Sequence, residues 1–137
     1  MSLLKVLQFG DNKSEKYNQK FLLLDYKCHV IRDHNEYRPT GEKQCERLEL
    51  TLVASKSSNT FIYQWFVNQE MKSGRFTIEY PIQGNNTSDE TRMVYFEDAM
   101  CYSIEEEYHI GDLQTRKLKL CILADKVTID EITFTRL

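Results

Sequence analysis

The sequence predicts a mainly β fold, an antiparallel two-sheet β-barrel or sandwich with one short amphipathic α-helix. Apolar and polar residues alternate through most of the 137 residues, which is typical of antiparallel strands with one buried face. One segment instead has apolar residues at helical spacing. About seven or eight short strands in a chain of this length favour a barrel or sandwich. We expect a single domain over residues 1–137.

The first alternating segment covers residues 21–31. Leu22, Leu24, Tyr26, Cys28 and Val30 share one face there, and we expect that face to be buried. The same alternation recurs at residues 47–53, 75–82, 92–108, 116–124 and 126–134.

Two of these segments carry opposite charges. Glu105 and Glu107 share one face of the first, and Lys117 and Lys119 share one face of the next. Opposite charges across a strand pair are favourable. The pattern predicts a hairpin with an acidic and a basic strand.

The helix is expected at about residues 58–70. Ser57, Ser58 or Asn59 can cap its start, and the sequence Lys-Ser-Gly at 72–74 is expected to stop it. Its predicted core anchors are aromatic and aliphatic residues at i, i+4 spacing: Phe61, Ile62, Trp65 and Phe66. We expect this helix to cover an open end of the barrel.

Composition excludes several classes of function. The net charge is −3 with a pI near 5.6, so there is no basic field for nucleic acid. No apolar run approaches the roughly 20 residues of a membrane span. The N-terminus lacks the features of a signal peptide. We therefore expect neither nucleic-acid binding nor membrane insertion, and we expect folding in the cytoplasm.

No catalytic, metal-binding or cofactor-binding residues are predicted. The three histidines, His29, His34 and His109, have no zinc-ligand spacing. The four cysteines form no C-x-x-C pair, and packing is the expected role of these thiols. The sequence favours a protein that is not an enzyme.

A long charged connection separates the first two alternating segments. Residues 32–47 are mostly polar, with Pro39 and Gly41 near the centre. A simple hairpin needs only two to five connecting residues. We call residues 32–47 the arm and expect it to be an extended loop.

The order of these segments resembles a known family. The similarity runs from about residue 26 to 129 and depends on four motifs: Arg38-Pro39, Trp65-Phe66, Lys72-Ser73-Gly74, and Phe96-Glu97-Asp98-Ala99 before Cys101. The chain resembles the tube protein of type VI secretion systems, the haemolysin-coregulated protein (TssD) family, in its Bacteroidetes branch. It departs from the family's usual pattern after Gly41, in a longer N-terminal segment and in the turn near Gly111.

The resemblance implies a structural role. Such subunits form homohexameric rings that stack into a hollow tube inside a contractile sheath. The tube is expelled with the spike and can carry effectors. The implied partners are the chain itself, the sheath, the spike or baseplate, and effectors. The implied location is cytoplasmic during assembly and extracellular after firing. Two alternatives stay open, a monomeric small-ligand-binding β-barrel and a phage-like tail tube protein.

Within that reading the arm has a candidate role. Its charged residues cannot be buried in the chain's own core, but they can make charge-complementary contacts with a neighbouring subunit or ring. The predicted self-assembly residues are Arg32, Asp33, Glu36, Tyr37, Arg38, Pro39, Glu42, Lys43, Glu46 and Arg47.

Overall fold

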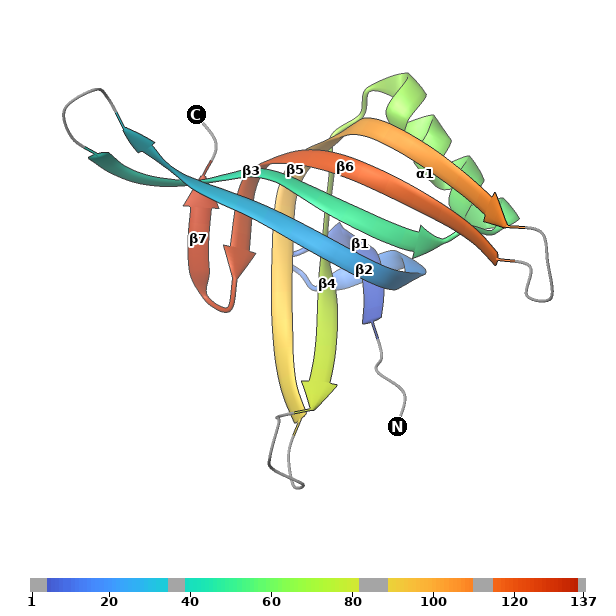
Figure 1. The fold of residues 1–137 in the computed structure, drawn as a ribbon, viewed down its shortest axis with the longest axis horizontal. Coiled ribbons are helices and arrows are strands. Elements are labelled where there is room, and N and C mark those ends of the chain that lie inside the picture. Colours follow the sequence, from blue (N-terminus) through green and yellow to red (C-terminus); the bar gives the residue numbers. More distant parts are fainter. Residues whose placement is uncertain (1–4, 35–38, 82–88, 110–114, 136–137) are drawn as a thin grey trace.

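The protein folds as seven strands and one helix (Figure 1) in the part of the chain described here. The computed structural model describes residues 5–34, 39–81, 89–109 and 115–135. The elements are β1 (Lys5–Asp11), β2 (Lys16–His34), β3 (Pro39–Val53), α1 (Lys56–Asn68), β4 (Lys72–Pro81), β5 (Asp89–His109), β6 (Thr115–Ile129) and β7 (Ile132–Thr135). The predicted hairpin of acidic and basic strands is confirmed, because Glu105 pairs with Lys119 and Glu107 with Lys117.

The sheet closes on itself. Its strands follow the order β3-β2-β1-β4-β5-β6-β7, and β3 also pairs with β6. All pairings are antiparallel. The closing ladder extends from Leu48↔Ile122 to Val53↔Lys117. The predicted antiparallel barrel with one helix is therefore confirmed.

Alternating side chains of every strand from β1 to β6 fill the barrel. At the closing ladder Leu48, Leu50 and Leu52 of β3 meet apolar partners of β6, and all are buried. Across the interior lie large buried residues of β1, β4 and β5, including Leu7, Phe76 and Phe96. The core is one continuous cluster of side chains. Such packing is what stabilises a small β-domain.

The prediction that one face of β2 is buried is wrong for three of its residues. Leu22 is 57% exposed and Leu24 is also exposed, whereas Leu23 is buried. The register explains this, because Leu23 pairs with Leu52 and Asp25 pairs with Thr51. An advance of two residues along β2 therefore matches an advance of one residue along β3, which defines a β-bulge. Beyond the bulge Tyr26 and Cys28 pack against the core, as expected. Val30 was also expected to be buried but is 48% exposed, because it lies beyond a second register shift, after β2 has left its partner β1.

The helix begins earlier than the sequence indicated. Ser55 is the N-cap, and its side chain accepts a hydrogen bond from the Ser58 backbone N–H. The Ser58 hydroxyl in turn accepts from the Ser55 backbone N–H at 2.8 Å. This reciprocal capping box satisfies two helix-end donors. The helix ends at Gln69, whose left-handed backbone forms the C-cap.

The Lys-Ser-Gly sequence at 72–74 lies inside β4 and is not the helix stop. Gly74 has a different task there. A Cβ atom at this position would lie 2.1 Å from the backbone oxygen of Gln8. Only glycine allows β4 to approach β1 this closely at Phe9↔Gly74.

Two of the four expected helix anchors lie fully in the core. Ile62 and Trp65 are buried, and Phe61 is half-buried against Phe9. The Trp65 indole N–H donates to the Glu70 carbonyl at 2.7 Å and lies 3.2 Å from the Ala99 carbonyl. The helix therefore joins β5 to the chain that follows α1.

The prediction that Phe66 anchors the core is wrong, because its side chain is 41% exposed. Each helical residue advances by about 100°. Viewed along the helix axis, Phe61, Ile62 and Trp65 therefore lie within an arc of about 100°, and Trp65 lies between the other two. Phe66 follows Trp65 and lies at the edge of the buried arc. Within the described residues, no helix is long and apolar enough to cross a membrane.

Replacement of Trp65 by alanine tests the packing of the helix. We expect Trp65→Ala to lower the free energy of unfolding by about 3–5 kcal/mol, because it leaves a cavity and removes the indole hydrogen bonds. The adjacent Phe66→Ala is the matched control and should change it by only about 0.5 kcal/mol. Urea unfolding of dilute protein measures both. Equal losses in the two variants would contradict the assigned helix orientation.

Candidate functional site

The arm is a β-hairpin rather than a loop. Strand β2 continues to His34 and β3 begins at Pro39. The two strands pair through the arm, with Arg32 opposite Lys43 and His34 opposite Pro39. Proline is tolerated at the first residue of a strand. In Figure 1 this hairpin extends beyond the barrel.

The predicted arm residues are described to different extents. Glu36, Tyr37 and Arg38 lie outside the described residues. The side chains of six more are also outside the description, although their backbones lie in strands: Arg32, Asp33, Pro39, Glu42, Lys43 and Glu46. Arg47 is described at the base of the hairpin.

The backbone edges of the hairpin are open. Strand β1 pairs with β2 only as far as Leu22, and β6 pairs with β3 only from Leu48. Among the described residues, the pairs of the arm are therefore Ile31↔Gln44, Arg32↔Lys43 and His34↔Pro39, and no third strand pairs with them. Unpaired N–H and C=O groups on a strand edge invite another chain to add to the sheet.

A charged cluster lies at the base of the arm. His29 Nε2 lies 2.7 Å from Glu49 Oε2, and Arg47 Nε lies 3.9 Å from the same oxygen. The hydrogen bond with His29 is the main cause that lowers the pKa of Glu49, with smaller help from the charges of His29, Arg47 and Lys27. Glu49 therefore stays ionised, which suits ion pairing and not general-acid chemistry.

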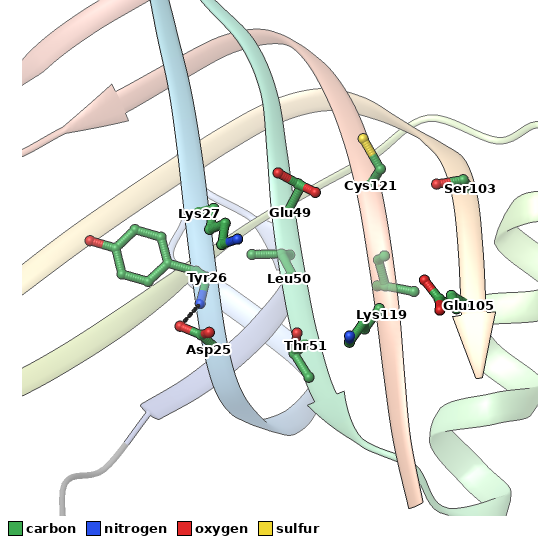
Figure 2. A pocket seen from close by; sticks show the side chains of 11 residues that line it. Asp25, Tyr26, Lys27, Glu49, Leu50, Thr51, Ser103, Glu105, Lys119 and Cys121 are labelled. Carbon is green, nitrogen blue, oxygen red and sulfur yellow. Dashed lines mark hydrogen bonds between the residues drawn. The ribbon is translucent and has the colours of Figure 1, made fainter. Parts of the chain in front are cut away.

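A shallow polar groove crosses the outer face of four strands (Figure 2). Its side chains come from two cross-strand rows of β2, β3, β6 and β5, which the register places side by side. One row is Lys27, Glu49, Cys121 and Ser103, and the other is Asp25, Thr51, Lys119 and Glu105. Such alternation on a solvated face of a sheet follows from the period of two.

Charges in the groove alternate in sign. Lys119 Nζ lies 3.1 Å from Glu107 Oε1, and this hydrogen bond raises the pKa of Lys119. Acidic and basic groups thus neutralise one another across the strands. No group of three or more potential metal ligands occurs within the described residues. The face is open and of mixed charge, with the acidic residues Asp25, Glu49 and Glu105 and the basic residues Lys27 and Lys119.

Two exposed apolar patches were not predicted as surface. The first consists of Leu22, Leu24 and Val53 on the outer face of β2 and β3. The second lies on α1 and consists of Tyr63, Phe66 and Val67, with Val67 70% exposed. These helix residues are at i, i+3, i+4 spacing and share one face. The signal was present in the sequence, because both segments have more apolar residues than one buried face can take.

One family model matches almost the entire chain. The family model for hemolysin coregulated protein Hcp (TssD) matches residues 1–136. No curated protein matches the sequence.

Several solved structures are similar in fold. Hcp1 from Flavobacterium johnsoniae has a TM-score of 0.66 and 14% identity, over 97% of this chain and 99% of that one. The Hcp1 protein from the E. coli EAEC 042 pathovar has a TM-score of 0.68 and 12% identity, over 98% of both chains. The SPP1 tail tube has a TM-score of 0.50 and 12% identity, over 98% of this chain and 77% of that one.

The Glu49–His29 contact predicts a pH dependence. The lowered pKa of Glu49 means that its ionised form stabilises the fold above the unfolded value of about 4.3. That contribution is lost as pH falls through the lower, folded pKa. We expect His29→Ala to raise the pKa of Glu49 clearly, and Lys27→Ala, which removes a weaker cause, to raise it less. Carboxyl-carbon NMR titration checks this, and an unchanged Glu49 pKa in His29→Ala would contradict it.

Proposed function

The chain belongs to the hemolysin coregulated protein Hcp (TssD) family and is a type VI secretion tube subunit, and we propose that its copies form rings of six that stack into a hollow tube. The family match over almost the entire chain carries this proposal. The likeness of its closed barrel to Hcp1 structures and to a phage tail tube supports a role in building tubes.

We infer a structural and not a catalytic role for the subunit. In the outer groove, Glu49 is held ionised and Lys119 is paired with Glu107. These groups form ion pairs on an exposed polar surface and are not arranged to move protons. A wetted wall of this kind suits the lining of a channel through which effectors pass.

A small-ligand-binding barrel is the less favoured alternative. That function requires an apolar cavity inside the barrel. Here the interior is occupied by the buried side chains of Leu7, Phe76, Phe96 and their neighbours. A phage-like tail tube protein would also build a hollow tube of stacked rings. This alternative therefore differs from the proposed function in the particle to which the tube belongs and not in the architecture of the tube.

Lateral contacts within the ring are assigned to the two apolar patches. The two patches lie on different elements of the subunit, with Leu22, Leu24 and Val53 on β2 and β3 and with Tyr63, Phe66 and Val67 on α1. A ring needs such a heterologous contact, in which one patch meets a different patch of the next copy. Apolar side chains that are exposed in the single chain gain stability when a neighbour covers them.

The arm is assigned to contacts between subunits or between rings. Its open strand edges can pair with a neighbouring chain, and its charges can fix the register of that contact. The sheath, spike and effectors are the further partners proposed from the family. Assembly in the cytoplasm followed by expulsion from the cell is the corresponding proposed itinerary.

The oligomeric state tests the proposed function directly. We expect light scattering after size-exclusion chromatography to give about six times the chain mass of 16.3 kDa, and negative-stain images to show rings. A heterologous patch-to-patch contact closes only at a fixed number of copies. A monomer at every concentration, or a monomer that retains a small ligand, would contradict the proposal.

Trimming of the arm tests its role separately. Arg32 and Lys43 are opposite one another, so an Asn-Gly turn in place of residues 33–42 can close the shortened hairpin. We expect this variant to keep the barrel fold but to lose stable rings or ring stacking in sedimentation. Far-UV circular dichroism and the urea midpoint control for folding. Rings and stacks as abundant as those of the unaltered chain would refute the bridging arm.

A further inference from the structure

Two thiols meet at the base of the arm. Cys28 of β2 and Cys45 of β3 are both reduced, and their sulfur atoms are 3.6 Å apart. In the register Cys28 is opposite Leu48, so a regular ladder would hold Cys45 farther away. A bulge intervenes, because His29 pairs with Arg47 while Val30 pairs with Cys45. The extra residue, Glu46, brings Cys45 toward Cys28.

The two sulfur atoms are in contact but not at bonding distance. A disulfide has an S–S length of about 2.05 Å, so closure requires the sulfur atoms at 3.6 Å to approach by about 1.5 Å. Cys45 is buried, and Cys28 is partly exposed and is the thiol that a reagent can reach.

Electrostatics favour Cys28 as the attacking group. The hydrogen bond with Cys45 lowers the pKa of Cys28, burial opposes this, and the Arg92 guanidinium lowers it further. The other two thiols differ. Burial raises the pKa of Cys101 to about 12 and also raises that of Cys121. A thiol with a lowered pKa and a second thiol 3.6 Å away has the features of a redox-sensitive pair.

We propose that Cys28 and Cys45 are a redox-active dithiol that closes to an intrachain disulfide on reaction with a low-molecular-weight disulfide. The Cys28 thiolate attacks one sulfur of the oxidant, whose S–S bond breaks and releases one thiolate. Cys45 then loses its proton and attacks Cys28 Sγ, which releases the second thiolate. Two protein thiols become one disulfide, and the two electrons reduce the oxidant to two thiols.

The cross-link would join the strands at the base of the arm. It closes a loop of residues 29–44, which contains residues 32–44 of the arm. Constraint of that loop restricts the unfolded and partly opened states of the hairpin. The dithiol chemistry depends on the two thiols alone, whereas its biological setting rests on the proposed function. A subunit expelled from the reducing cytosol would meet oxidising conditions outside.

Peptide mapping tests this inference on the full-length chain. The protein is equilibrated in glutathione redox buffers, its remaining thiols are alkylated, and it is digested with trypsin without reduction. Cleavage after Lys27, Arg32, Lys43 and Arg47 isolates peptides 28–32 and 44–47, each with one cysteine. We expect these two peptides to be joined by a disulfide in oxidising buffer and separate in reducing buffer.

Variants define the roles of the two thiols. With Cys45→Ser, we expect Cys28 to stop at the mixed disulfide with glutathione, because no second thiol displaces it. The matched control, Cys101→Ala with Cys121→Ser, should keep the link between residues 28 and 45. The peptide map of the unaltered chain tests the proposed disulfide even if a variant fails to fold. Glutathione adducts alone, links between chains, or links to Cys121 would overturn the proposal, whether or not the chain forms rings.

Discussion

The pairing of β3 with β6 is the constraint on which the rest of the structure depends. This ladder, from Leu48↔Ile122 to Val53↔Lys117, converts an open sheet into a closed barrel. Closure removes two exposed edges and sets Leu50 against Leu120 in the core. It also places Glu49 beside Cys121 and Thr51 beside Lys119 on the outer face. Core and groove are thus two faces of the same hydrogen-bonded ladder.

Closure also determines where the sheet stays open. The ladder between β3 and β6 ends at Leu48, yet β3 begins nine residues earlier at Pro39. Strand β2 likewise continues beyond its last partner on β1. In the described structure the hairpin that results has its own hydrogen bonds, but no further strand pairs with it on either edge. The arm is therefore what remains of two long strands after the barrel has closed.

The sequence predicted the strands, the helix and the hairpin of acidic and basic strands, because these depend on local alternation. It could not place the β-bulges, since an extra residue changes the face of every side chain that follows. Leu22 and Leu24 were therefore assigned to the core, and the approach of Cys45 to Cys28 was not foreseen. Phe66 was misplaced for a related reason, because i, i+4 spacing defines a stripe but not its centre. The arm was taken for a loop because its polar residues do not alternate with apolar ones.

The residues that were wrongly predicted to be buried share one property, an exposed apolar side chain. Each bulge or helix turn that moved an apolar side chain outward left it exposed in the single chain, and the two patches so formed lie on different elements. An isolated domain gains nothing from such exposure. A subunit that must join identical copies needs apolar surface that its own core does not use. The departures from a simple inside–outside pattern therefore leave apolar surface that the proposed assembly can use, around a barrel whose interior is occupied by its own side chains.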